Sequence, residues 1–442
     1  MPARYGAWVV LSEGLAPVTD WRAITNQEGI ENPTMTNNPD MTNGPDAANI
    51  DGLRSVVSRR RLLALAGGAA LLGACSSTAK KLAAPTTVAT TAPSVAPTST
   101  STTVADTTDD TTDDTTEVAD TGPVIDNAGS TVVDATASTV APPTVQPLTG
   151  LPLTDPTLLN KVALVVKVSN DPGARPQTGL NDPDIIFEAW GAGPTRFATI
   201  WHSRDLDFVG PIRSCREQDV NLVGEFNRAV FACSGGNPGN LALLRSSDLL
   251  LVQEGQGPGW ELDPKRGRPH KTHLNTAKVR SNAGPYRTGP AQQFHYRAEG
   301  AAPTGGTPMS GFDLHIQQVF VQWRWNAKSS TYLRAQDGHP HILTDKKQVS
   351  TENVIIAFLD YYPSHTDRRS PDGTTTGTNP ALVFTGGQLI NATWTRADRL
   401  SPFSFTDASG APVLLTPGRT FIELPNSGKG SFPGNDTFAT IV

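Results

Sequence analysis

Residues 76–147 consist almost entirely of Thr, Ser, Ala, Pro, Val and Asp, and they contain no aromatic side chain. Such a segment cannot bury enough apolar surface to offset the entropy that it would lose on ordering. Its repeated Thr-Thr-Asp-Asp runs are low-complexity sequence and not structural repeats. We therefore predict a disordered linker over 76–147, so that the fold must be built mainly from the residues that follow it.

The charge of the chain is concentrated in this linker. It holds nine acidic residues and two lysines, whereas the whole 442-residue chain has a net charge of −6. Residues 148–442 are therefore close to neutral, which excludes a strongly basic nucleic-acid-binding body. The chain has only 37% hydrophobic residues, together with 36 prolines and 40 glycines, as expected when part of it does not fold. The sequence contains no run of about 20 apolar residues, so we predict no membrane span.

An export signal precedes the linker at residues 58–75. Ser58-Arg59-Arg60-Arg61 opens a short apolar stretch that ends in Leu72-Gly73-Ala74-Cys75. A basic start, an apolar stretch too short to span a bilayer and small residues at its end are typical of a secretory signal. The last four residues resemble a bacterial lipobox, whose cysteine becomes the lipid-bearing N-terminus. A buried helix with an incidental cysteine is the alternative.

This segment predicts a lipoprotein. Two or three acyl chains on Cys75, palmitate among them, would anchor the protein to the extracytoplasmic face of the bacterial cell membrane. The adjacent arginines resemble a twin-arginine signal, while general secretory export remains open. Residues 1–57 are expected to be a poorly ordered extension. Since signal peptides begin close to the initiator, Met35 or Met41 is the expected start, and a long basic region is the alternative.

The folded part begins near Pro147 and changes character along its length. Up to about residue 305, strands are predicted at 161–169, 184–190, 196–203 and 229–233, and helices at 215–228 and 238–247. The first helix depends on a capping box formed by Ser214 and Glu217, and the second on a start at Asn237-Pro238. Further strands are predicted at 319–325, 331–334, 354–361, 381–384, 388–394 and 419–424.

These elements predict an α+β fold. A mixed α/β domain at 148–305 is followed by a mostly β domain at 306–426 and a peripheral tail at 427–442. Both domains lie behind the signal peptide and the disordered linker.

Several separated motifs of the folded part resemble the DUF3048 family of bacterial lipoproteins. They are, in order, 147–152 (PLTGLP), 170–180 (NDPGARPQTGL), 184–189 (DIIFEA), 210–216 (GPIRSCR) and 415–420 (LTPGRT). The resemblance covers about 147–425 and implies an α/β-type domain and a mostly β domain on a lipid anchor. It implies no activity, because the function of the family is unknown. Cys215 stands where the family usually has alanine, and Cys233-Ser234 lacks a histidine that relatives often place before the glycine pair.

Arginines gather in turns and at strand ends of the first domain. Several converging guanidinium groups would bind a carboxylate or a phosphate. The predicted ligand-binding residues are Asn170, Arg175, Gln177, Arg196, Arg213 and Arg216, with Glu188 able to complete the pocket. The alternative is a set of ordinary ion pairs and loop braces, such as Arg196 with Glu188.

Cysteine and histidine offer further candidates. Outside the cytoplasm, Cys215 and Cys233 are expected to form a disulfide, although buried free thiols or a catalytic cysteine are also compatible with the sequence. His270 and His273 have HxxH spacing and His339-Pro340-His341 is an HxH motif, but no complete zinc signature is present. We expect no metal and no cofactor, and His270 is a candidate acid or base.

Three functions are compatible with these observations. The first is a lipoprotein that binds a polar or anionic cell-envelope ligand, such as a cell-wall glycan or its fragments, through the arginines. The second is an envelope hydrolase or transferase with Glu188 as acid or base. The third is an assembly factor that contacts other envelope proteins. No GxSxG, Walker A or Rossmann motif decides whether the chain is an enzyme.

Overall fold

The computed structural model describes residues 8–11, 14–17, 143–285, 288–432 and 438–442, all of which belong to one compact unit. The predicted signal peptide, Cys75 and nearly all of the predicted linker lie outside these residues. Of the described residues, 39% are in strands and 11% in helices, so the fold is mostly β.

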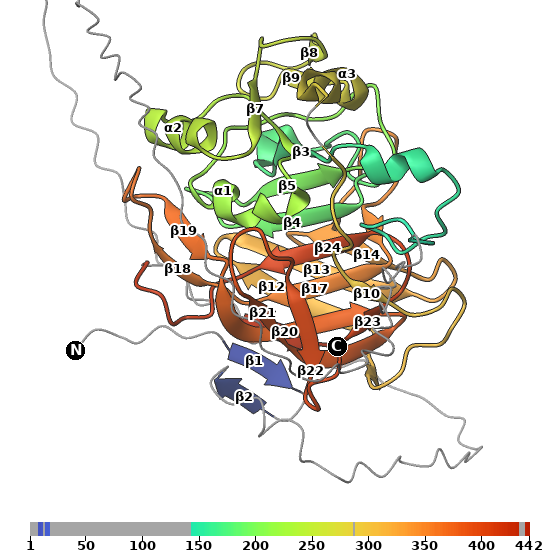
Figure 1. The fold of residues 1–442 in the computed structure, drawn as a ribbon. Coiled ribbons are helices and arrows are strands. Elements are labelled where there is room, and N and C mark those ends of the chain that lie inside the picture. Colours follow the sequence, from blue (N-terminus) through green and yellow to red (C-terminus); the bar gives the residue numbers. More distant parts are fainter. Residues whose placement is uncertain (1–7, 12–13, 18–142, 286–287, 433–437) are drawn as a thin grey trace, which may run out of the picture. The chain divides into compact units, whose positions relative to one another are not determined.

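The larger sheet contains strands from both predicted domains (Figure 1). Its order is β11 (Thr307–Pro308), β21 (Gln388–Arg396), β20 (Gly377–Thr385), β17 (Asn353–Ala357), β24 (Thr420–Leu424), β4 (Ile185–Ala189), β5 (Arg196–Trp201), β3 (Leu164–Ser169), β6 (Val230–Cys233) and β7 (Leu250–Gln253), with β22 (Ser404–Asp407) on β21. Strand β24 pairs in parallel with β17 on one side and with β4 on the other. The two halves of the sequence therefore share one continuous sheet.

The smaller sheet comes mainly from the second half of the chain. Its order is β15 (His339–Pro340), β14 (Thr331–Gln336), β13 (Val319–Asn326), β12 (Gly311–Ile316), β25 (Phe438–Ile441), β1 (Trp8–Leu11) and β2 (Gly14–Pro17), with β16 (Ser350–Thr351) on β14. Three two-stranded sheets complete the fold: β10 (His295–Tyr296) with β23 (Leu414–Leu415), β18 (Asp360–Pro363) with β19 (Pro371–Thr374), and β8 (Trp260–Leu262) with β9 (Thr272–Leu274). Since β25 pairs with β12, residues 438–441 are part of a sheet and not a peripheral tail.

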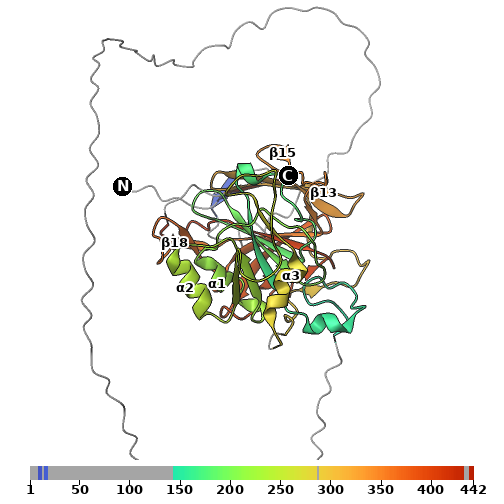
Figure 2. The ribbon, with the colours of Figure 1, turned by 90° about the horizontal axis from the view of Figure 1, so that it is seen from above.

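The described helices are short. They are α1 (Gln218–Leu222), α2 (Pro238–Ser246) and α3 (Thr276–Arg280), with 3-10 turns at Pro156–Asn160, Pro172–Ala174, Gly224–Phe226 and Ser281–Ala283. Helices α1 and α2 and strand β18 lie on the same side of the molecule in both views (Figures 1 and 2).

Both faces of the larger sheet are buried. Along β3, Leu164, Val166 and Val168 face one hydrophobic cluster, whereas Val165 faces the other. The first cluster also contains Trp323 of β13, so the smaller sheet covers this face of the larger one. This alternation follows from the period of two along a strand. It explains why the buried strands are almost wholly apolar.

The predicted strands are confirmed in position, but one predicted helix is much shorter than expected. Each predicted strand overlaps an observed one, and α2 begins after Asn237, whose side chain accepts a hydrogen bond from the Asn240 amide at 2.7 Å. The helix predicted at 215–228 is limited to α1 and a 3-10 turn. Asn227 and Arg228 have φ angles of 51° and 60°, in the left-handed region, which ends any helix before them.

Candidate functional site

Polar side chains collect at one edge of the larger sheet. Strands β3, β6 and β7 run parallel, so the loops that follow Ser169, Cys233 and Gln253 leave the sheet at the same edge. Strand β5 is antiparallel to β3, and its first residue, Arg196, is the partner of Ser169. In open sheets with parallel strands, binding sites lie at this edge because several loops meet there.

The segment 213–216 crosses this edge in an extended form. The Arg213 amide donates to the Lys167 carbonyl at 2.8 Å, and the Arg213 carbonyl accepts from the Ser234 amide at 3.1 Å. The Cys215 amide donates to the Gly235 carbonyl at 2.9 Å. The segment is thus fixed between β3 and the loop that joins β6 to α2.

Two guanidinium groups are bound to consecutive carbonyls of this segment. Arg196 Nη1 donates to the Ser214 carbonyl at 2.9 Å. Arg216 Nη1 donates to the carbonyl of the preceding residue, Cys215, also at 2.9 Å. Neither forms an ion pair with a carboxylate among the described residues, and Arg216 Nε is buried without a hydrogen-bond partner there. Burial, followed by the charges of Arg216 and Arg213, lowers the pKa of Arg196 to about 9. The charges of Asp171 and Asp219 act in the opposite direction on Arg196, so the edge holds guanidinium groups that have acids nearby but no direct ion pair on Arg196 or Arg216.

Arg213 belongs to the same edge but is paired. It contacts Asp171 through Nη2 at 2.8 Å and Nε at 3.0 Å, and His270 Nε2 lies 3.3 Å from the same carboxylate oxygen. Burial tends to raise the pKa of Asp171, but hydrogen bonding by Ser169 and the charge of Arg213 lower it overall. Asp171 is not among the predicted site residues, yet its carboxylate contacts two of them, Arg213 and His270.

A polar hollow of about 560 Å³ lies beyond His270. It is lined by Gly173, Arg175, Asp263, Lys265, Arg266, Gly267, Arg268, His270 and Thr344. Its arginines are largely neutralised, since Arg175 pairs with Asp337 at 3.1 Å and Arg268 with Glu254 at 2.7 Å. Arg175 therefore has an acidic partner of its own, Asp337, unlike Arg196 and Arg216.

The remaining predicted residues are buried between the two sheets. Glu188 has no exposed surface, and its carboxylate accepts from Arg334 Nη2 at 2.7 Å and from Asn170 Nδ2 at 2.9 Å. Gln177 is equally buried, accepting from His341 Nε2 at 2.8 Å and donating to the Ser169 carbonyl at 3.0 Å. Asn170, Gln177 and Glu188 therefore do not line the pocket that the sequence predicted.

The two cysteines of the folded part are neighbours. Cys215 and Cys233 are buried free thiols, and a hydrogen bond between them together with burial raises the pKa of Cys215. The same hydrogen bond lowers the pKa of Cys233. The structure does not contain the predicted disulfide, but it brings together the two thiols that would form it, and the disulfide stays a prediction.

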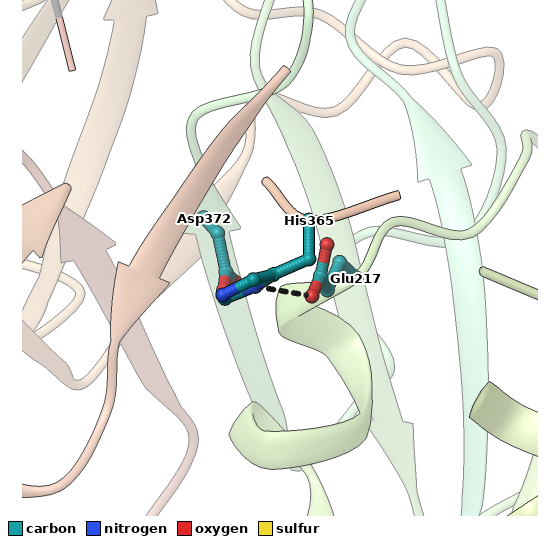
Figure 3. A group of neighbouring side chains, drawn as sticks. All are labelled: Glu217, His365 and Asp372. Atoms are coloured by element: carbon teal, nitrogen blue, oxygen red, sulfur yellow. Dashed lines mark hydrogen bonds and ion pairs between the residues drawn. The ribbon is translucent and has the colours of Figure 1, made fainter. Parts of the chain in front are cut away.

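The histidine motifs of the sequence do not form metal sites among the described residues. His273 stacks on Phe208 with ring centroids 4.2 Å apart, His339 is exposed on β15, and His341 is buried against Arg334. A different set, Glu217, His365 and Asp372, brings its ligating atoms within 4.8 Å of one another (Figure 3). No sequence signal could have found it, because the spacing between Glu217 and His365 follows no short motif.

Comparison with known families identifies the chain. The model described as "Protein of unknown function (DUF3048) N-terminal domain" matches residues 148–287, and the corresponding C-terminal domain matches 312–422. The chain therefore belongs to the DUF3048 family. This confirms the resemblance seen in the sequence.

A curated relative and a solved structure agree with this assignment. The chain is 28% identical over 291 residues to YerB of Bacillus subtilis (strain 168), a protein named as a candidate lipoprotein, and the match covers 63% of this chain and 85% of the relative. The crystal structure of YerB from Bacillus subtilis shares the fold, with a TM-score of 0.55, 23% identity, and coverage of 63% of this chain and 96% of that one. Among the described residues, no helix is long and apolar enough to cross a membrane.

Proposed function

We propose that the protein is an extracytoplasmic lipoprotein, anchored through acyl chains on Cys75, that binds an anionic cell-envelope ligand at the arginine edge formed by Arg196, Arg213 and Arg216. The lipid anchor is supported by the lipobox-like sequence and by the lipoprotein name of the relative. The export route, twin-arginine or general secretory, is a separate proposal that the paired arginines support.

One observation supports the binding site above all others. Arg196 of β5 and Arg216 donate to consecutive carbonyl groups of segment 213–216, and neither forms an ion pair with the described carboxylates. Two neighbouring guanidinium groups that lack a direct ion pair repel each other, and an anion between them would relieve that repulsion. The donor geometry of a guanidinium suits a carboxylate or a phosphate.

The binding proposal is better supported than a catalytic one. Glu188 has no exposed surface and is held by Arg334, Asn170 and Thr195, so a substrate has no access to it in this structure. Its burial argues against the alternative in which Glu188 is the acid or base of an envelope hydrolase or transferase.

The test is calorimetric titration of the full chain with two cell-wall fractions, one carrying muropeptide carboxylates and one carrying phosphate polymers. We expect saturable binding of one fraction. Arg216→Gln and Arg196→Gln should each weaken it by roughly tenfold or more, since a charge-assisted hydrogen bond contributes roughly 1.5–3 kcal/mol. Arg204→Gln is the matched control, because Arg204 is half-exposed and pairs with Asp182 away from the edge.

Two results would refute the proposal. Absence of binding to both fractions would refute it, as would equal binding by wild type, Arg196→Gln and Arg216→Gln. Arg216→Gln keeps the test valid if the more buried Arg196 variant is unstable.

A further inference from the structure

Three side chains from separate parts of the sequence surround one point beside α1. Glu217 directly precedes α1, His365 lies in the loop between β18 and β19, and Asp372 lies on β19 (Figure 3). Glu217 Oε1 and His365 Nδ1 are 3.0 Å apart, and one ligating atom of each of the three residues lies within 4.8 Å of the others. Imidazole nitrogen and carboxylate oxygen are both ligand types that Zn²⁺ accepts in proteins.

The surroundings hold the two acidic ligands in place. Glu217 Oε2 accepts from the Thr366 amide at 3.0 Å and from the Ser364 hydroxyl, which leaves Oε1 directed at His365. Strand β19 is tied to α1, because the Gly373 amide donates to Gln218 Oε1 at 3.2 Å. Hydrogen bonds of this kind orient metal ligands in known sites.

A second observation points to a missing positive partner. Asp372 Oδ1 is buried and has no hydrogen-bond partner among the described residues. A buried carboxylate oxygen without a donor is unfavourable, and such groups are rare in proteins unless an ion or a water completes them.

We propose that Glu217, His365 and Asp372 form a binding site for a divalent transition-metal ion, and that Zn²⁺ is the ion that fits it. Three protein ligands leave a fourth tetrahedral position for water or a bound molecule, as in open zinc sites. Ca²⁺ requires six to eight oxygen ligands, and Mg²⁺ favours carboxylates and water over imidazole. The side chain of His365 is 87% exposed, so an ion can enter from solvent.

The site adjoins the arginine edge but does not depend on the function proposed for it. Glu217 follows Arg216 in the chain, so a bound cation would add positive charge beside that guanidinium. The zinc proposal stands on the ligating atoms alone. Arg216→Gln should therefore keep the zinc equivalent, with an affinity equal to or higher than that of wild type because a neighbouring positive charge is removed, which separates failure of one proposal from failure of the other.

The test is calorimetric titration of Zn²⁺ into the full chain, purified without a polyhistidine tag and with its thiols reduced. We expect one equivalent of Zn²⁺ that is not displaced by excess Mg²⁺ or Ca²⁺. Glu217→Gln, His365→Gln and Asp372→Asn should each weaken that equivalent by about tenfold or more. His339→Gln, at an exposed histidine on β15, is the matched control and should bind as wild type does.

The result that would overturn the proposal is the absence of such an equivalent, or its persistence in all three ligand variants. His365→Gln is the decisive variant, because an exposed side chain can be replaced without loss of the fold. Unfolding curves without metal show that each variant is folded, and a rise in melting temperature on adding Zn²⁺ only in wild type and the control is the second readout.

Discussion

Arg334 places a fully buried charge between the two sheets. Its guanidinium donates to Glu188 Oε2 at 2.7 Å, to Gln336 Oε1 at 2.8 Å and to His341 Nδ1 at 2.6 Å. The rings of Phe197 and Phe421 lie 5.6 and 5.7 Å from its central carbon. A buried charge is tolerated only when it is both paired and hydrogen-bonded, and this arginine is both.

Two glutamates share this arginine. Glu188 and Glu423 are register partners on β4 and β24, and burial together with the charge of Glu188 raises the pKa of Glu423. The environment therefore favours the neutral form of Glu423, next to the ion pair that Arg334 forms with Glu188 at 2.7 Å. Trp323 Nε1 donates to Glu423 Oε1 at 2.8 Å, which ties the smaller sheet to the same pair.

Replacing Arg334 should be costly. Arg334→Met leaves the charge of Glu188 buried and unpaired, so we expect a loss of roughly 3–5 kcal/mol in the free energy of unfolding, measured by urea denaturation. Arg324→Met, on the neighbouring strand, is the control. Its side chain is 42% exposed and pairs with Asp313, so the cost should stay below about 1 kcal/mol. Adding Glu188→Gln to Arg334→Met should restore part of the loss, and a double variant no better than Arg334→Met would contradict this account.

His202 makes the stability depend on pH. Burial, then the charges of Arg280 and Lys161, lower its pKa from 6.5 to about 4. Between these two values the unfolded chain binds a proton that the folded protein does not. Stability is therefore complete above pH 6.5 and falls as the pH is lowered towards 4, by roughly 3 kcal/mol from this residue alone.

The measurement is the free energy of unfolding at a series of pH values from 7 to 4. His202→Gln should have a shallower loss than wild type over this range, whereas His339→Gln, at an exposed histidine, should follow wild type. Identical slopes for wild type and His202→Gln would contradict this account, because they would mean that the pKa of His202 is the same in the folded and unfolded protein.

At the level of single elements, the sequence predicts local structure well. Short runs of β-branched residues between turn residues predict buried strands. Strands β3 and β6 fit this pattern, since all of their residues are buried. Helix α2 was predicted because its start depends only on neighbouring residues, Asn237 and Pro238. Such signals are contained in a few consecutive positions, so no knowledge of the rest of the fold is needed.

The errors arise where a side chain has a distant partner. Glu217 fits a capping box in the sequence, yet it makes no such cap, because its carboxylate is bound to Ser364 and Thr366, far along the chain. Glu188 and Gln177 look like pocket residues for the same reason, since their partners are distant in sequence: Arg334 lies on β14 of the smaller sheet and His341 directly follows β15. Of the predicted arginines, Arg196, Arg213 and Arg216 do meet. Pairing of β3 with β5 places Arg196 beside Ser169, and segment 213–216 is hydrogen-bonded to β3.

At the scale of the whole molecule, β24 joins the two predicted domains. It lies between β17 and β4, so a strand from the second predicted domain pairs with β4 of the first. We expect a fragment of residues 143–305 to show no cooperative thermal unfolding, because β4, four of whose five residues are apolar, would have an unpaired edge. Near-ultraviolet circular dichroism of the fragment and of the full chain is the measurement, and a cooperative transition in the fragment would contradict the expectation.

The position of β24 also fixes the order of events as the chain is made. Strand β4 ends at Ala189, but the strand that covers its edge begins only at Thr420, so the larger sheet cannot close until the chain has been made as far as β24. Pairing across so long a separation is slow, and both β4 and β17 have an unpaired edge until then, which can pair with other chains. The interval between the synthesis of β4 and that of β24 is therefore the period in which the newly made chain is most exposed to aggregation.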